Sequence, residues 1–423
     1  MAYPIEPAPR DSAATRLRRI QIQFGGIVVP FSRLPHEQAA RAGICHWHHM
    51  LVVRISGSAC SLANVRRQIT NPSGEGNAML VWHSTPFSML TACLVMLLSN
   101  GVAQAFDIDA IVKVAPSRCL NTYSSVITIK DGVYDNGITV RSIANTTIDF
   151  RGVTVRAQAN SSSAKSMTIV RNFNNVCVLG GRHWGKQDPQ VVPWTIGHKI
   201  YGAGLLFKTG AGSILLENAV IENSLQDGIT LGGDLASNTS FGMRGVRIEN
   251  TSDDGIQNDG GKKILFIEDS LIESKMGLSM RPGADSNTST FGNYKIPIRH
   301  SLFNIICVAD DRVDGSCGPG RSASSLFKSS GAAKGVTVEM TDSIVRYEAR
   351  PGGSWSGIRW LPGTYRNVIF VWDPETPGLK YAGPSWPAGV TFTTDPSVWT
   401  NAKSAWLRVH GCTAGGNCTF PGS

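Results

Sequence analysis

Residues 203–207 read AGLLF, residues 227–231 read DGITL, residues 254–258 read DGIQN, and residues 276–280 read MGLSM. Each phrase places a glycine before an aliphatic residue, and the four glycines lie 24, 27 and 22 residues apart. Short alternating segments that recur at this period predict a solenoid of β-coils, in which each coil covers the apolar row of the next. Related phrases, NGITV at Gly137 and SGIRW at Gly357, extend the pattern along the chain.

A second phrase keeps the same period as the first. Ile221, Ile248 and Ile272 lie in ENAVIENS, MRGVRIENT and IEDSLIES, and they are spaced by 27 and 24 residues. A β-sandwich does not explain two phrases that recur in step, and the Leu and Asn spacing of leucine-rich repeats is missing. The 45 glycines and the low charged fraction of 17% also favour an all-β chain with many tight turns.

The first hundred residues differ from the rest of the chain. Residues 1–78 contain nine Arg and no Lys, with no strand or helix periodicity. An apolar run over residues 89–98 is followed by Ala103, Gln104 and Ala105, which is typical of a signal peptide. The run is short for a membrane anchor, the alternative interpretation. We therefore expect a signal peptide at 79–105, an upstream extension without structure at 1–78, and a secreted or periplasmic protein.

The charge and cysteine content of residues 106–423 fits an exported protein. This part holds 31 basic and 27 acidic residues, a charge of +4, which is compatible with an acidic polymer as ligand. No cysteine spacing matches a zinc site, and disulfides are expected in an oxidising compartment. The pairs Cys307–Cys317 and Cys412–Cys418 are close enough in sequence to close small loops.

A helix is expected near the end of the chain. Asp395 is a suitable N-cap, Pro396 fits the first helical position, and Gly411 follows the last helical turn. One face of this helix would carry Trp399, Ala402, Trp406 and Val409. We expect a cap, over about residues 376–423, that covers the last open coil.

Several aspartates recur at the turns before the repeated strands. Adjacent coils lie about 4.8 Å apart, so residues on successive coils become neighbours. Asp-Gly pairs are also common at turns for backbone reasons alone. The stacking favours a functional strip, with candidate catalytic residues Asp227, Asp253, Asp254 and Asp259 and candidate substrate-binding residues Lys208, Lys275 and Arg281.

Two long loops are expected beside this strip. Residues 180–204 carry Trp184 and Trp194, whose rings offer flat faces for sugar stacking, together with His183. The alternative is that the tryptophans cover the adjacent coil. Residues 281–334 form the second insertion. Two loops flanking one strip predict a cleft, the usual place for a ligand.

The sequence from about 120 to 375 resembles the right-handed parallel β-helix proteins of the pectate lyase and polygalacturonase superfamily. Polygalacturonases carry an Asp on one coil, an Asp-Asp pair on the next and Gly-His-Gly on a third. Here Asp227 lies in SLQDG and Asp253 and Asp254 in SDDG, whereas Lys275 and Met276 stand where the histidine phrase falls. The resemblance implies a right-handed parallel β-helix acting on polysaccharide.

Three functions remain open at this point. A glycoside hydrolase needs one carboxylic acid of raised pKa and one carboxylate, and it needs no cofactor. A polysaccharide lyase or epimerase would use a Lys or Arg base, with Ca²⁺ held by carboxylates such as Asp253, Asp254 and Asp259. A non-catalytic surface protein would bind polysaccharide along the solenoid. In each case we expect a monomer with polysaccharide as partner, no nucleic acid, and no membrane attachment after signal cleavage.

Overall fold

The computed structural model divides the chain into two compact units, residues 1–97 and residues 98–423. In the first unit it describes the backbone of four strands. In the second it describes residues 107–420 except 115, 157–165, 201, 259, 282–290, 312–316, 318, 331–332, 349–357, 375–380, 382–384 and 414–415.

The four strands of the first unit form two separate antiparallel pairs. Strand β1 (Ile20–Phe24) pairs with β2 (Ile27–Phe31), and β3 (Leu51–Ile55) pairs with β4 (Ser58–Leu62). The sequence did not lead us to expect strands in residues 1–78. The expected signal peptide at 79–105 lies outside the described residues and stays a prediction.

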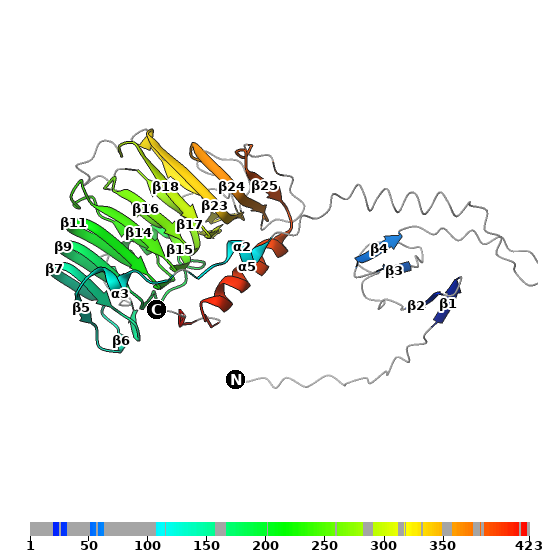
Figure 1. Cartoon of the computed structure of the whole chain (residues 1–423), viewed down its shortest axis with the longest axis horizontal. Coiled ribbons are helices and arrows are strands. Elements are labelled where there is room, and N and C mark those ends of the chain that lie inside the picture. Colours follow the sequence, from blue (N-terminus) through cyan, green and yellow to red (C-terminus); the bar gives the residue numbers. More distant parts are fainter. Residues whose placement is uncertain are drawn as a thin grey trace, which may run out of the picture. The chain divides into compact units, whose positions relative to one another are not determined.

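The second unit is an all-β parallel solenoid with a C-terminal helix, as predicted (Figure 1). Its main sheet of 19 strands is built from coils whose strands pair in parallel with those of the next coil. The right-handed sense of the coil stays a prediction. The strands of this unit are β5 (Ser125–Thr128), β6 (Gly132–Tyr134), β7 (Ile138–Asp149), β8 (Val153–Arg156), β9 (Thr168–Leu179), β10 (Arg182–Trp184), β11 (Leu205–Glu217), β12 (Val220–Glu222), β13 (Ile229–Leu231), β14 (Ser240–Arg244), β15 (Arg247–Asn258), β16 (Lys263–Glu268), β17 (Leu271–Met280), β18 (Tyr294–Arg299), β19 (Leu302–Ile305), β20 (Val308–Ala309), β21 (Arg321–Ser322), β22 (Phe327–Ser329), β23 (Val336–Tyr347), β24 (Gly363–Trp372) and β25 (Val390–Thr393).

The repeated glycines form one column along the solenoid. A Cβ atom on Gly204 would lie 2.8 Å from the carbonyl oxygen of Gly228, and one on Gly228 would lie 2.7 Å from that of Gly255. A Cβ atom on Gly255 would likewise lie 2.9 Å from the carbonyl oxygen of Gly277. Neighbouring backbones therefore approach too closely for a side chain at this corner. The column continues to Leu326, before β22, whereas Gly357 lies outside the described residues.

The second repeated phrase supplies the interior of the solenoid. Ile221 pairs with Ile248, Ile248 with Ile272, and Ile272 with Phe303, so these side chains stack in one inward column. All four are fully buried. The alternation of strand side chains then directs the residues on either side of each isoleucine to the outer surface.

Helix α5 (Pro396–Val409) begins and ends where the sequence predicted. The Asp395 side chain accepts a 2.9 Å hydrogen bond from the backbone N–H of Ser397, and Gly411 has a φ of +60°. The helix packs along the side of several coils, where Trp399 and Trp406 join one apolar cluster (Figure 1). That cluster includes Val220, Leu271, Leu302, Ile344 and Ile369, which come from five of the strands along this side of the solenoid. The helix therefore covers the side of the coils, and the expectation that it covers the last open coil stays a prediction.

The remaining helices of this unit are short. They are α2 (Ile108–Ile111), α3 (Cys119–Thr122) and α4 (Trp194–Ile200). No helix in the described part of the chain combines the length and the hydropathy that a membrane crossing requires.

Three disulfides connect the six cysteines of the solenoid unit. Cys307–Cys317 and Cys412–Cys418 were predicted from their spacing. The third, Cys119–Cys177, joins α3 to β9 across 58 residues and is buried. Each of the three disulfides cross-links segments in a loop or at an end of the solenoid.

Candidate active site

Asp227 and Asp254 lie on neighbouring coils, as predicted, but they do not line a groove. Asp227 is 5% exposed and Asp254 is 1% exposed. The Asp227 carboxylate accepts a 2.9 Å hydrogen bond from Thr230 Oγ1 and a 3.3 Å bond from the backbone N–H of Asp254. Asp254 lies 3.7 Å from Lys328 Nζ. Both carboxylates thus hold the corner of the solenoid, so the turn interpretation describes them better than the catalytic one.

The other two predicted aspartates differ from these. Asp253 is half-buried and accepts a 2.9 Å hydrogen bond from the indole Nε1 of Trp194, the first residue of α4. Its contact fastens the loop before β11 to the coil. Asp259 lies outside the described residues.

The three predicted basic residues are not gathered in one site. Lys275 is 4% exposed and forms a buried ion pair with Asp310, which also accepts a 2.9 Å hydrogen bond from Ser322 Oγ. Its expected contact with substrate was wrong, because the charge is neutralised inside the protein. Lys208 is half-buried, 4.0 Å from an Asp234 oxygen, and Arg281 is exposed directly after β17.

His183 was expected to contact substrate, and the structure contradicts this. It pairs with Ile221 in the inward column and is fully buried, with Thr168 Oγ1 2.9 Å from its Nδ1. Burial lowers its pKa to about 3, so the ring stays neutral in the core. Trp184, next along β10, points outward, and the guanidinium of Arg182 lies 5.3 Å from the centre of its ring.

The two predicted loops contact each other. The backbone N–H of Ala309 donates to the carbonyl of Pro189 at 3.2 Å, and Thr195 donates to the Asp311 carboxylate. Arg321 Nη2 donates to the Gln190 amide oxygen at 2.6 Å. The loops therefore form a single wall beside the solenoid.

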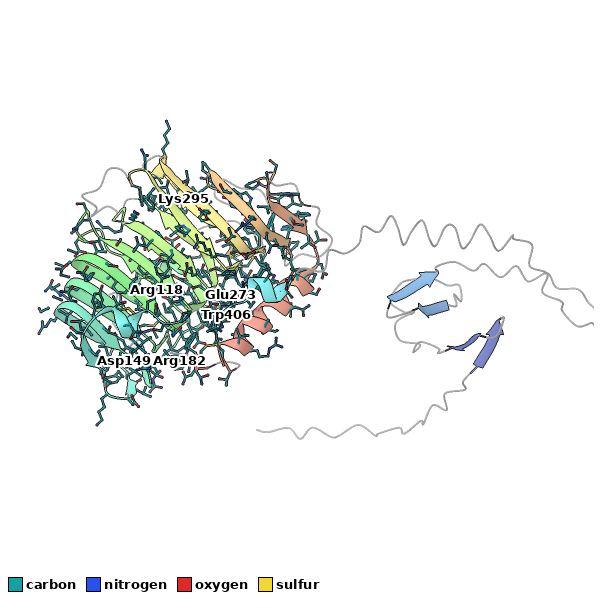
Figure 2. The ribbon with its side chains drawn as sticks, viewed as in Figure 1. Arg118, Asp149, Arg182, Glu273, Lys295 and Trp406 are labelled. Carbon is teal, nitrogen blue, oxygen red and sulfur yellow. A yellow bond between two sulfur atoms is a disulfide. The ribbon has the colours of Figure 1, made fainter. Side chains whose placement is uncertain are left out.

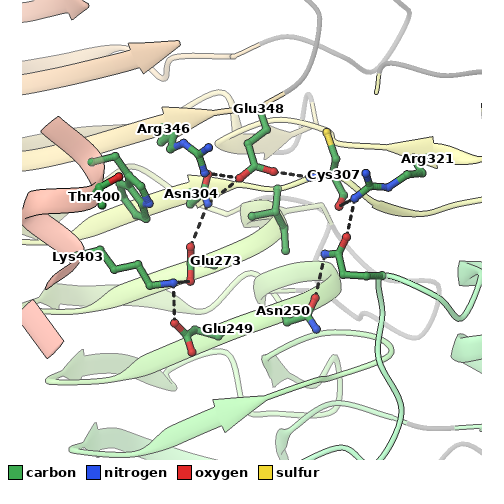
Figure 3. Close-up of a pocket in the computed structure, with 13 residues that line it drawn as sticks. Glu249, Asn250, Glu273, Asn304, Cys307, Arg321, Arg346, Glu348, Thr400 and Lys403 are labelled. Carbon is green, nitrogen blue, oxygen red and sulfur yellow. Dashed lines mark hydrogen bonds and ion pairs between the residues drawn. The ribbon is translucent and has the colours of Figure 1, made fainter. Parts of the chain in front are cut away.

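A pocket of about 580 Å³ lies between this wall and α5 (Figure 3). Its volume is within the range of small-molecule sites in proteins. It lies over the face next to the corner that holds Asp227 and Asp254, called here the aspartate corner. Its lining includes none of the candidate catalytic or substrate-binding residues predicted from the sequence. The pocket is lined by Gln190, Glu249, Asn250, Glu273, Asn304, Ile306, Cys307, Arg321, Arg346, Glu348, Trp399, Thr400 and Lys403.

The floor of the pocket is an outward column of polar residues. Glu249 pairs with Glu222 on the preceding coil, Glu273 pairs with Asn304, and Asn304 pairs with Arg346. The sequence contained the signal for this column. Ile221, Ile248 and Ile272 are each followed by Glu, and strand alternation turns that Glu outward beside its inward isoleucine.

Two of these carboxyl groups share one lysine. Lys403 of α5 lies 3.0 Å from a Glu249 oxygen and also forms an ion pair with Glu273. The charge of Glu249 also acts on Glu273 and raises its pKa. Figure 2 shows Glu273 next to α5, the helix that carries Trp406. The cap helix therefore completes the site as well as covering the apolar column.

The two carboxyl groups differ in their protonation. Burial raises the pKa of Glu273 to about 7; the negative charge of Glu249 adds to this, and Lys403 opposes it. Burial would also raise the pKa of Glu249, but Lys403 and Arg247 together outweigh it and lower this pKa to about 2. Glu273 therefore binds a proton more readily than Glu249 does, and it exchanges that proton near neutral pH.

A third carboxyl group lies across Asn304. The Asn304 side-chain nitrogen donates 3.0 Å hydrogen bonds to both Glu273 and Glu348. Their two accepting oxygens are therefore at most about 6 Å apart. Glu348 also forms an ion pair with Arg346 and accepts a 3.2 Å bond from the backbone N–H of Cys307. The pocket thus holds a carboxyl group of raised pKa near a second carboxyl group that is paired with Arg346.

Metal binding by the predicted aspartates is not supported by this geometry. Among the described residues, no group of three or more His, Cys, Asp or Glu side chains is placed to hold a metal ion. Asp259, one of the three residues considered for Ca²⁺, lies outside those residues.

No family model matches the sequence, and no curated protein matches it. Among solved structures, the chain is similar to a candidate glycosyl hydrolase from Parabacteroides merdae ATCC 43184. The identity is 8% and the TM-score 0.28, over 52% of this chain and 82% of the other.

Proposed function

We propose that this protein is an exported glycoside hydrolase whose active site is the pocket between α5 and the two loops. The observation that carries the proposal is the Asn304 bridge, which places an oxygen of Glu273 within about 6 Å of an oxygen of Glu348, and burial raises the pKa of Glu273. Glycoside hydrolysis needs one carboxyl group that donates a proton to the leaving oxygen and a second that attacks or activates water. Glu273 fits the first role and Glu348 the second.

The separation of the two carboxyl groups decides the stereochemical course. Retaining enzymes hold them about 5–5.5 Å apart, and inverting enzymes about 6.5–9.5 Å apart to admit a water. The limit of about 6 Å applies to the two oxygens that Asn304 contacts and admits both spacings; we propose the retaining course, with Glu348 as nucleophile. Glu249 would keep the proton on Glu273, because its negative charge raises the pKa of Glu273.

The substrate and location follow from the lining and the disulfides. Polar and charged side chains predominate in the pocket, as sugar hydroxyl groups require, and Trp399 contributes an aromatic surface. Its volume suits one or a few sugar rings of a polysaccharide. Three disulfides favour an oxidising compartment, secreted or periplasmic.

A second candidate function is non-catalytic polysaccharide binding. It is favoured by the ion pairs of the pocket, because Lys403 binds Glu249 and Glu273 while Arg346 binds Glu348. Such pairs also occur where charge only fastens one element to another. The lyase alternative has less support, because Lys275, one of the two basic residues that could act as its base, is buried against Asp310.

A panel of acidic and neutral polysaccharides separates these functions. Hydrolysis gives new reducing ends without new ultraviolet absorbance, whereas a lyase leaves a conjugated unsaturated uronate. Retention on a polymer whose length does not change would indicate a binding protein and contradict the proposed hydrolase.

A further inference from the structure

The segment between β19 and β22 forms a hairpin at the edge of the pocket. Val308 of β20 pairs with Ser322 of β21 in antiparallel fashion, and Ala309 pairs with Arg321. The Cys307–Cys317 disulfide joins the residue before β20 to the loop between β20 and β21. Cys307 is fully buried and lines the pocket, so the disulfide belongs to the pocket wall.

Residue 307 is held from three directions. Its sulfur is bonded to Cys317, its carbonyl oxygen accepts a 2.7 Å hydrogen bond from Arg321, and its backbone N–H donates to Glu348 at 3.2 Å. The N–H is thus aimed at one oxygen of the Glu348 carboxylate, while Asn304 and Arg346 bind the other oxygen. Both oxygens of Glu348 therefore have fixed donors.

We propose that the Cys307–Cys317 disulfide is a positioning device for Glu348, which holds the residue 307 N–H against that carboxylate so that Glu348 stays oriented toward Glu273. This inference rests on the proposed function, because Glu348 is the nucleophile only if the pocket is a glycosidase site. The positioning itself is a property of the structure that can be measured without any substrate.

Other contacts anchor the hairpin in place when the disulfide is absent. The buried Lys275–Asp310 ion pair ties it to β17, and the backbone bond from Ala309 to Pro189 ties it to the neighbouring loop. Removal of the disulfide should therefore loosen residue 307 without unfolding the solenoid. Displacements of about 1 Å at a catalytic group can cost about 10²-fold in rate.

Cys119–Cys177 offers a matched control. It encloses 58 residues against 10 for Cys307–Cys317, so its removal should relax the unfolded chain more and lower Tm more. It joins α3 to β9 and contributes nothing to the pocket lining. The two disulfides thus separate an effect on stability from an effect on positioning.

The test compares the full chain with the double variants Cys307→Ala/Cys317→Ala and Cys119→Ala/Cys177→Ala. For the first we expect a loss of about 10²-fold in kcat with little change in KM. We also expect faster hydrogen exchange at the amide of position 307, with the strands still protected. For the second we expect the larger fall in Tm, with kcat and that amide unchanged at a temperature where it is folded.

The inference is overturned if the first variant keeps both its kcat and the protection of the amide at position 307. It is equally overturned if the two variants lose activity in proportion to their loss of Tm. If the wild-type chain hydrolyses no glycan, the proposed function fails, and exchange at position 307 alone then decides whether the disulfide positions Glu348.

Discussion

Glu273 of β17 and Asn304 of β19 are paired neighbours in the parallel sheet, and the Asn304 side-chain nitrogen donates a 3.0 Å hydrogen bond to the Glu273 carboxyl group. The same nitrogen donates to Glu348, so one amide sets the spacing of the two proposed catalytic groups. This arrangement arises because the coils stack in register, which brings residues far apart in sequence to adjacent positions on one face.

The first prediction concerns the pH dependence of stability. The pKa of Glu273 rises from 4.5 to about 7 on folding, so the folded state holds an extra proton between these values. The free energy of unfolding should therefore fall as pH rises through this window, by about 1.4 kcal/mol per pH unit at most. Below pH 4.5, the lowered pKa of Glu249 has the opposite effect on stability. The stability that Glu249 contributes is lost as pH falls toward about 2.

Urea unfolding of the wild type and of Glu273→Gln across this pH range measures the contribution. The glutamine keeps the shape of the protonated acid and does not titrate. The difference between the two proteins should grow steadily from pH 4.5 to about pH 7 in favour of the variant. Parallel curves would show that Glu273 titrates normally.

A second prediction separates the aspartate corner from the pocket. Asp227→Asn should lower the free energy of unfolding by about 1–3 kcal/mol, because one of the two hydrogen bonds to its carboxylate loses its acceptor. Asp254→Asn should act in the same direction by removing the charge next to Lys328. Both variants should keep wild-type hydrolysis while folded. A rate loss of about 10²-fold or more at unchanged stability would restore the original catalytic assignment.

The third prediction tests the glycine column. A Cβ atom at Gly255 would lie 2.7 Å from Ile272 Cγ2 and 2.9 Å from the Gly277 carbonyl oxygen. Gly255→Ala should therefore lower stability by about 1–3 kcal/mol, as overpacking does elsewhere. Gly416→Ala is the control, because its Cβ would meet Thr413 Oγ1, the end of a rotatable side chain. Equal Tm values for Gly255→Ala and the wild type would argue against the close approach of the coils.

The fold was predictable because its signal is periodic. The glycine and isoleucine phrases recur at coil length, and they identified the register of β13, β15 and β17 as well as the helix after Asp395. The candidate site was predicted at the aspartate corner rather than at the pocket. The Asp-Gly pairs were chosen because acidic residues recur at successive turns. In the structure the Asp227 carboxylate is buried and accepts hydrogen bonds from a side chain and from the backbone of the protein itself.

The pocket depends on contacts that a repeat does not contain. Lys403 reaches Glu249 and Glu273 only because α5 lies along the side of the coils, and no sequence pattern gave that orientation. The loop wall likewise depends on pairings such as Arg321 with Gln190, which are 131 residues apart. The glutamates after each inward isoleucine were the one part of the site that strand alternation could have shown.

The most direct test of the account is the rate at which Glu273→Gln releases reducing ends from a glycan that the wild type cleaves. General acid catalysis typically contributes about 10²–10⁴-fold, and we expect a loss of that size with the fold intact. The loss should be much smaller on an aryl glycoside whose leaving group needs no proton. Glu339→Gln, on β23 and outside the pocket, should match the wild type. A folded Glu273→Gln protein that cleaves the natural glycan at the wild-type rate would contradict the proposed active site.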